Sequence, residues 1–458
     1  MMKTKAPLKP KKRNRSSAAS KRLPHWVHLI AQDGYDTFAI AAKIKAVMDR
    51  ESVSVAGKSV FLKVSFVFPV RDPERVKHII TNPAFIAGVA QALVERGASV
   101  VYIGDAETFA TARYSFDIVD MQKALKALPE SIRKNVVCCY LDEVYKEWIT
   151  PDDPFCPEIR LDYPKIVRDV DVYISLPKLK VNIFADITLS VKNGMGLITK
   201  ETRLRYHNEN LHAMIADIFQ VRPPDYVITD AVFAGEAQGP MEATPYPMNL
   251  ILFGNNGPSV DTVCCNLMGY DPREVKHLML LHERGFGPID LKTVRVENAK
   301  LLNERRHVFT RPSMELAHLS SNITCHQGEC CASGCLPFVR ALLDGYGLNR
   351  GWESLGEYTI IMGKNLDIPE ATLKKLKKRK TLVYGDCVER YRKYGVFYRG
   401  CPPDYINALI TFPIRTSLGR TPWLGYVEYW TRIKTDLLHL LSKLRGKKYR
   451  TLRGRVKK

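Results

Sequence analysis

The chain has 458 residues, 45% of them hydrophobic, which is enough for two or three domains with buried cores. Its formal net charge of +21 lies almost wholly in two tails: residues 1–22 carry nine Lys and Arg and no acid, and residues 431–458 carry eleven Lys and Arg and one Asp. The body between the tails is nearly neutral, which argues against a nucleic-acid-binding fold, and no apolar run approaches the ~18 residues that span a bilayer.

The two basic tails differ, and only the N-terminal one is predicted to be disordered. Residues 1–23 are mostly Lys, Arg, Pro, Ser and Ala, a composition typical of disorder. Basic tails attract RNA, DNA and anionic lipid without reading a sequence, although solvated tails with only opportunistic affinity are the simpler interpretation. The N-terminus lacks the apolar core of a secretory signal, and clustered thiols favour a reducing compartment, so we expect a cytoplasmic protein.

From about residue 57 the sequence alternates between strand and helix patterns. Residues Val60–Phe68 are rich in β-branched and aromatic side chains and predict the first strand. A helical period follows over Ala84–Arg96 and stops at Gly97, a residue suited to ending a helix. Further strands are predicted at Ser99–Ile103, Asn135–Leu141, Asp171–Leu176, Tyr226–Thr229 and Asn249–Phe253, and further helices at 117–128, 203–219, 258–267 and 272–284.

This alternation predicts an α/β fold for residues 24–300, a mostly parallel sheet with helices on both faces. A smaller, cysteine-rich α/β unit is predicted over residues 301–422. Its strands are Tyr358–Met362 and Thr381–Tyr384, and its helices are Glu370–Lys377 and a segment from Asp404 onward. Residues 423–458 predict a basic amphipathic helix and tail, and the helix either packs on its own domain or docks on a membrane or partner.

Ligands of parallel α/β sheets bind beyond the carboxyl ends of the strands, so polar residues there are site candidates. The densest polar segment runs from Leu176 to His207. Its lysines, amide, glycines and imidazole suit an anionic or carbonyl-bearing ligand, and a desolvated lysine can act as a base or nucleophile. The alternative is that the segment only satisfies a buried turn. The candidates are Lys180, Asn193, Gly194 and Gly196 for ligand binding, and Lys192 and His207 for catalysis.

Two acidic residues follow another predicted strand. Asp230 and Glu236 are candidates for a metal site or for an acid–base pair in catalysis. Asp261 opens a predicted helix, where a negative charge is favoured by the helix dipole, and we assign it that structural role.

Taken in order, these residues carry a family resemblance. It rests on Lys192-Asn193 with Gly196, His207, Asp230 with Glu236 and Gly239-Pro240, Asp261, and the run Met268-Gly269-Tyr270-Asp271-Pro272. Over about residues 58–300 the chain resembles the domain of unknown function 362 family. The resemblance implies an iron–sulfur protein, because many members carry a ferredoxin-like module with CxxCxxCxxxCP runs. This chain has no such run, so the resemblance assigns neither ligands nor a reaction.

Six of the eleven cysteines form two clusters late in the chain. These are Cys325, Cys330, Cys331 and Cys335 in the first, and Cys387 and Cys401 in the second. Thiolates gathered between small residues bind soft metals, above all iron–sulfur clusters and zinc. Because adjacent cysteines rarely both bind one metal, we expect Cys335, Cys387 and Cys401 to be joined by one of the other three. A redox-active dithiol or ordinary buried cysteines are the alternatives.

These features predict a redox protein. An iron–sulfur cluster, with 4Fe–4S as one candidate, or zinc would lie in the cysteine-rich unit, near a cleft that binds a small anionic or carbonyl ligand. Such a protein needs an electron-transfer partner, and whether it is an oxidoreductase stays open. The alternative is a non-catalytic, metal-stabilised binding or scaffold protein, attached to RNA or to a membrane surface by its basic tails.

Overall fold

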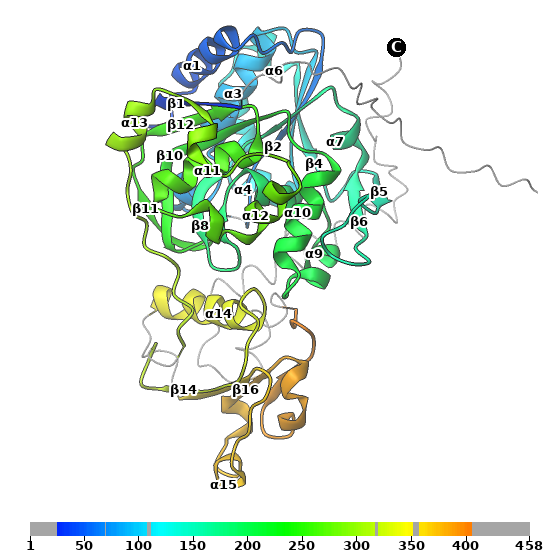
Figure 1. Ribbon diagram of the computed structural model, residues 1–458, viewed down its shortest axis with the longest axis vertical. Coiled ribbons are helices and arrows are strands. Elements are labelled where there is room, and N and C mark those ends of the chain that lie inside the picture. Colours follow the sequence, from blue (N-terminus) through cyan, green and yellow to red (C-terminus); the bar gives the residue numbers. More distant parts are fainter. Residues whose placement is uncertain (1–24, 69, 108–110, 317–318, 351–356, 405–458) are drawn as a thin grey trace, which may run out of the picture.

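The computed structural model describes residues 25–404, except 69, 108–110, 317–318 and 351–356. The two basic tails and the helices predicted from Asp404 onward and within 423–458 therefore lie outside the described residues. The described chain forms a large α/β domain and, beyond a connecting segment, a smaller α/β unit (Figure 1).

The large domain is built on an eleven-stranded sheet, along which β13-β1-β12-β10-β7-β2-β3-β4 lie side by side in that order. The strands from β10 to β4 are parallel, whereas β12 is antiparallel to both β1 and β10. The strands are β1 Trp26–Ala31, β2 Ser59–Lys63, β3 Val100–Asp105, β4 Val136–Tyr140, β7 Val172–Ser175, β8 Lys178–Asn182, β9 Asp186–Thr188, β10 Tyr226–Gln238, β11 Glu242–Tyr246, β12 Leu250–Gly254 and β13 Arg295–Glu297. A separate hairpin pairs β5 (Lys146–Ile149) with β6 (Leu161–Pro164).

Helices cover both faces of this sheet, because successive side chains of a buried strand point to opposite sides. In β2, Val60 and Leu62 pack into one hydrophobic cluster and Phe61 into the other. The first face is covered by α1 Thr37–Arg50, α2 Pro73–Ile79, α3 Pro83–Glu95, α4 Ala112–Ile118, α5 Met121–Lys126 and α6 Glu130–Arg133. The second is covered by α7 Lys165–Asp169, α8 Ser190–Asn193, α10 Leu211–Val221, α11 Gly257–Met268, α12 Lys276–Glu283 and α13 Ala299–Glu304.

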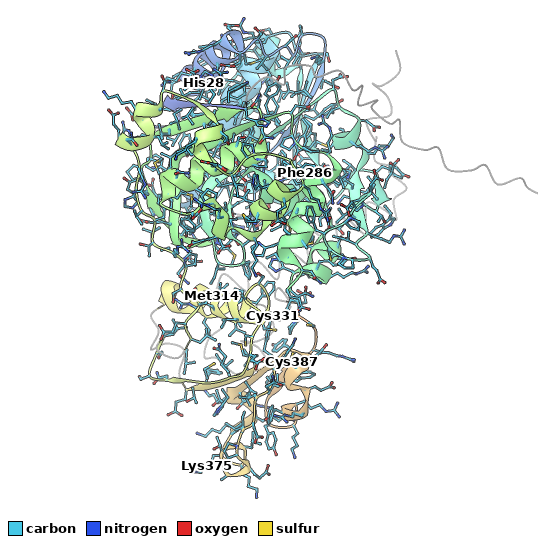
Figure 2. The ribbon with its side chains drawn as sticks, in the orientation of Figure 1. His28, Phe286, Met314, Cys331, Lys375 and Cys387 are labelled. Carbon is cyan, nitrogen blue, oxygen red and sulfur yellow. The ribbon has the colours of Figure 1, made fainter. Side chains whose placement is uncertain are left out.

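The smaller unit is a four-stranded parallel sheet in chain order, β14 Ile323–Gln327, β15 Tyr358–Met362, β16 Thr381–Tyr384 and β17 Val396–Tyr398. Helix α14 (Cys335–Arg350) connects β14 to β15, and α15 (Glu370–Leu373) follows β15. Figure 2 labels Cys331 and Cys387 in this unit, on its side toward the large domain.

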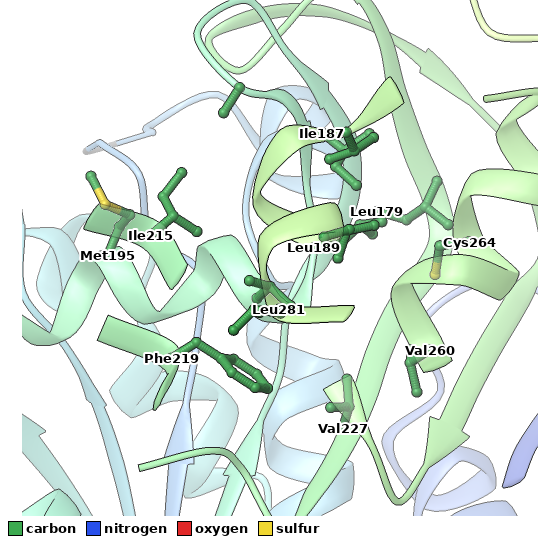
Figure 3. Packing of buried hydrophobic residues seen from close by; sticks show 14 of the residues in the cluster. Leu179, Ile187, Leu189, Met195, Ile215, Phe219, Val227, Val260, Cys264 and Leu281 are labelled. Atoms are coloured by element: carbon green, nitrogen blue, oxygen red, sulfur yellow. The ribbon is translucent and has the colours of Figure 1, made fainter. Parts of the chain in front are cut away.

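Figure 3 shows part of the core on the second face of the sheet, under α10, α11 and α12. Phe219 and Leu281 from the helices pack with Val227 from β10, and Cys264 is buried among them as a small hydrophobe. Cys265 is likewise fully buried, as expected for cysteines in apolar runs. Across the described residues, every helix is too short or too polar to cross a membrane.

The predicted fold class is confirmed: the sheet is mostly parallel and carries helices on both faces, with a second α/β unit behind it. The strand Tyr358–Met362 and its neighbour Thr381–Tyr384 have the predicted bounds. Several predictions differ in extent: the strand predicted at Tyr226–Thr229 continues to Gln238, and the helix predicted over Glu370–Lys377 ends at Leu373. Strand β2 ends at Lys63 and not at Phe68, and the helix predicted over 203–219 is two helices, α9 (Lys200–Tyr206) and α10, since the chain turns at Asn208, whose side chain accepts from the Asn210 amide.

Candidate functional site

A cavity of about 130 Å³ lies at the carboxyl ends of β7, β2 and β3. Its charged lining consists of Lys63, Asp105, Lys192 and Arg203. Apolar walls come from both parts of the chain, with Phe66, Phe184, Met195 and Met241 from the large domain and Phe338 from α14. The position is where ligands of parallel sheets bind, and Phe338 of the smaller unit forms part of the wall.

Lys63 and Asp105 form a buried ion pair on the cavity wall. Lys63 is the last residue of β2 and Asp105 the last of β3, and Lys63 Nζ lies 2.7 Å from Asp105 Oδ1. Asp105 also accepts from the amides of Phe66 (2.7 Å) and Ala106 (2.8 Å). Burial lowers the pKa of Lys63 and raises that of Asp105, and the charge of each partner opposes the shift of the other.

The loop that carries Asn193 and Gly196 is fitted closely around this pair. Asn193 Nδ2 donates to the Lys63 carbonyl (2.9 Å) and to Ser175 Oγ (3.0 Å). A Cβ atom at Gly196 would overlap Asp105 Oδ1 and lie 2.5 Å from Lys63 Nζ. The side chain of Asn193 therefore hydrogen-bonds buried groups around a turn, which is the alternative to ligand binding that the sequence left open. Gly196 leaves room for the ion pair.

Lys192 differs from its neighbours because its amine has no hydrogen bond or ion pair with any residue that the structure describes. It lines the cavity from α8 and is only partly buried. Desolvation, with the charges of Arg203 and Lys63 in second place, lowers its pKa to about 8. The start of α8 is held by Asp261, which accepts from the amides of Ser190 (2.8 Å) and Val191 (3.0 Å).

Arg203 and His207 bring α9 to the cavity. The guanidinium of Arg203 is anchored to the carbonyls of Ala106 (3.4 Å) and Glu107 (2.8 Å). His207 Nδ1 lies 3.3 Å from the carbonyl of Ser333, so this nitrogen is the donor and Nε2 is left as an acceptor. Burial, followed by the charge of Lys192, lowers the pKa of His207 to about 3, which keeps the ring neutral near physiological pH.

The remaining candidates lie away from this lining. Lys180 is fully buried and donates to the Ile79 carbonyl, and Gly194 packs against Ile218. Asp230 is fully buried in an ion pair with Lys178, at 3.0 Å. Glu236 accepts from the Thr310 amide (2.9 Å) and lies 3.4 Å from His307 Nε2, on the far part of β10. Asp230 and Glu236 are thus in separate surroundings, and neither lines the cavity.

The late cysteines gather at the carboxyl edge of the smaller sheet. Three strands end there, and the chain after them carries Cys330, Cys387 and Cys401, while Cys335 begins α14. Burial raises the pKa of Cys335 to about 12, with added contributions from four neighbouring thiols, Cys330, Cys401, Cys331 and Cys387. Cys325 lies within β14, and burial followed by the charge of Cys330 raises its pKa to about 11.

These thiols lie in one region of the smaller unit, but their side chains do not converge on a common point as metal ligands would. All six are free, and Cys387 and Cys401 are exposed. Among the residues that the structure describes, no three His, Cys, Asp or Glu side chains lie close enough to hold one metal ion. Binding a metal there would require the thiol side chains to rotate toward one another, so the predicted ligand set stays a prediction.

Two neighbouring residues, His207 and Asn208, connect the cavity to the segments that carry the late cysteines. His207 contacts Ser333, and its ring packs between Phe184 and Phe338 at centroid distances of 5.0 and 4.9 Å. Asn208 donates from Nδ2 to the Cys401 carbonyl, at 3.3 Å. The end of α9 therefore touches the ligand cavity on one side and the cysteine segments on the other.

Sequence reasoning missed the part of the site that lies on the strands. Lys63 was hidden inside an apolar run assigned entirely to a strand, although a lysine in such a run is itself a signal. Asp105 follows a predicted strand directly, the position at which a ligand site is expected. Phe338 carries no signal, because only the tertiary structure brings α14 to the cavity.

Comparison with known proteins confirms the predicted resemblance. The family model described as Domain of unknown function (DUF362) matches residues 60–266, the segment that carries Lys63, Asp105, Lys192, Arg203 and His207. A thylakoid-associated protein of Synechocystis sp. is 25% identical over 272 residues, which cover 57% of this chain and 80% of that protein.

Two solved structures show a distant likeness. One is a Thermotoga maritima protein, with a TM-score of 0.34 and 11% identity over 51% of this chain and 59% of that one, about three fifths of its length. The other is the lactate racemase apoprotein of Thermoanaerobacterium thermosaccharolyticum, with a TM-score of 0.35 and 12% identity over 85% of this chain and 81% of that one. At these TM-scores neither likeness bears on function.

Proposed function

We propose that this chain, which belongs to the DUF362 family through its residues 60–266, binds a small anionic ligand in the cavity and a soft metal at the adjoining thiols. The observation that carries the proposal is the amine of Lys192, which has no partner among the described residues, in a cavity lined by two further cations. The function that follows is electron transfer to or from the bound ligand.

The charge balance of the cavity favours an anion. Lys63, Lys192 and Arg203 line it, whereas two buried carboxylates, Asp105 on its wall and the nearby Glu107, act on them, which leaves one positive charge in excess. A desolvated charge without a partner costs several kcal/mol, and a bound anion would supply the missing counter-charge. Phe66, Phe184 and Phe338 make part of the wall apolar, and an apolar wall strengthens the charge interactions beside it.

The possible metal ligands of the smaller unit are cysteine thiols, and thiolates prefer soft metals. Cys335, Cys387 and Cys401, with one of Cys325, Cys330 or Cys331, would be the ligands, and these thiols are close enough to raise one another's pKa. A bound iron–sulfur cluster supplies one-electron transfer. The chain's own contribution is to hold the two sites together through His207 and Asn208, and to keep His207 neutral as an acceptor toward the cavity.

Anion binding is tested by ligand-induced stabilisation of the full chain. We expect lactate, pyruvate or inorganic phosphate to raise the melting temperature of the wild type, by an amount equivalent to about 2.7 kcal/mol at a hundredfold excess over Kd. Lys192→Met should abolish the effect. The matched control is Lys300→Met, which removes an exposed lysine 3.2 Å from Glu304 and should leave binding intact. Equal stabilisation of the wild type and Lys192→Met would contradict the proposal.

Metal binding is tested by anaerobic purification, followed by visible spectroscopy and iron, sulfide and zinc analysis. We expect a broad visible band that bleaches on reduction, and loss of iron in Cys387→Ala. Cys138→Ala, which removes a thiol from β4 in the large domain, is the control and should keep its iron. A colourless protein with stoichiometric zinc would rule out the iron–sulfur centre, and a metal-free protein would rule out both centres.

A further inference from the structure

The Lys192 amine is placed as a nucleophile would be. It lines the cavity from a short helix whose start is fixed by Asp261, and no described residue engages its nitrogen. Its neighbours Lys63 and Arg203 are held by partners of their own, Asp105 and the carbonyls of Ala106 and Glu107 respectively. A lysine that served only the fold would be expected to share in such a network.

The size of the cavity limits the ligand to a few heavy atoms. Its volume is about 130 Å³. A cavity of roughly 150 Å³ accommodates a molecule of the size of benzene. The ligand class is therefore that of the smallest organic acids, with about four to seven heavy atoms by the same comparison.

The surrounding charges favour a carboxylate next to the position of the amine. Arg203 and Lys63 both act on Lys192 electrostatically, and guanidinium groups are the usual partners of carboxylates. The apolar part of the lining, with Phe184 and Phe338, suits a short carbon chain. A small 2-oxo acid combines these features, since its carboxylate and its electrophilic carbonyl carbon are adjacent.

The ionisation of Lys192 is consistent with nucleophilic attack. With its pKa lowered to about 8 by burial and by the charges of Arg203 and Lys63, about a tenth of the amine is neutral at pH 7. For an ordinary lysine the neutral fraction is far below 1%. Neutral amine is the form that attacks a carbonyl.

We propose that Lys192 condenses with the carbonyl group of a small 2-oxo acid to form an imine. This deepens the proposed function, on which it rests, by naming the ligand class. The Nζ lone pair attacks the carbonyl carbon and a carbinolamine forms. One amine proton moves to the former carbonyl oxygen as the carbinolamine forms. Loss of this hydroxyl group together with the second amine proton releases one water molecule, and a C=N bond replaces the C=O bond. No electrons are gained or lost in this step, so it needs no co-reactant.

The test is reductive trapping on the full-length wild-type chain with pyruvate and cyanoborohydride, followed by peptide mapping. Hydride adds to the imine carbon and leaves a carboxyethyl group on the modified lysine. We expect Lys192 to be labelled at least about tenfold faster than the exposed Lys300 at pH 7, because more of its amine is neutral. The rate should rise up to about pH 8 and level off above it. Lactate, which has no carbonyl group, should slow the labelling of Lys192 and not that of Lys300.

The outcomes separate this inference from the anion-binding proposal. Labelling of Lys192 no faster than that of Lys300 overturns the imine. If lactate still stabilises the wild type and not Lys192→Met, the anion site survives that result. If lactate has no effect on stability either, both fail. Because the mapping is carried out on the wild type, the result does not depend on a variant that folds.

Discussion

Replacing Asp230 with alanine is expected to lower the free energy of unfolding by about 3–5 kcal/mol, because it leaves the charge of Lys178 buried without a counter-ion. Both side chains are fully buried, and their charged atoms lie 3.0 Å apart. Asp230 also accepts from Tyr35 Oη (3.0 Å) and from the amides of Asn82 (3.0 Å) and Val232 (3.3 Å), so the substitution removes four partners at once. Urea unfolding of the full chain measures the loss.

Two variants make this prediction specific. The double variant Lys178→Met, Asp230→Leu removes both charges and should recover most of the lost stability, since an apolar pair of similar volume tolerates burial. Glu304→Ala, which breaks an exposed pair with Lys300, should cost about 0.5 kcal/mol or less. A cost for Asp230→Ala as small as that for Glu304→Ala would show that this ion pair is not a determinant of the fold.

Gly196→Ala is expected to destabilise the protein by about 1–3 kcal/mol through overpacking and to abolish anion binding. The new methyl group would occupy the place of the Lys63–Asp105 pair, whose atoms are held by the strands β2 and β3 and by the Phe66 amide. Unfolding curves measure the first effect, and ligand-induced stabilisation by lactate measures the second.

The neighbouring Gly194→Ala is the matched control. There the added methyl group meets only a methyl group of Ile218, at 3.0 Å, which can yield by a few tenths of an ångström. We expect a stability change within about 1 kcal/mol of zero, because the strain is offset by the lower chain entropy of alanine. If both glycine variants lose anion binding equally, the tight fit at Gly196 is not what shapes the cavity.

The fold class followed from the sequence because its strands are short apolar runs between helical periods. The same apolar pattern obscured the site. Lys63 lies among side chains that read as one strand, and nothing in its immediate sequence shows that β2 ends there. His207 and Lys192 were found because they lie in a polar segment after a strand. Asp230 was found for the same reason, yet its environment is an ion pair in the core.

The cysteine-rich unit was less predictable. The strands β15 and β16 were found, whereas β14 and β17, which are needed to bring the cysteine segments to one edge, were not. Spacing along the chain cannot reveal this edge, since Cys335 and Cys401 are 66 positions apart. Only the parallel order of the strands brings their segments together.

The wall supplied by Phe338 matters when the ligand preference of a relative is inferred from its sequence similarity to this chain. The matched segment, residues 60–266, contains every charged residue that lines the cavity, but not the helix that carries Phe338. A relative that shares this segment and carries a different second unit would expose the same cations to bulk water, where their attraction for an anion is much weaker. Ligand preference in such relatives would thus depend on two segments of sequence, of which the family model covers one.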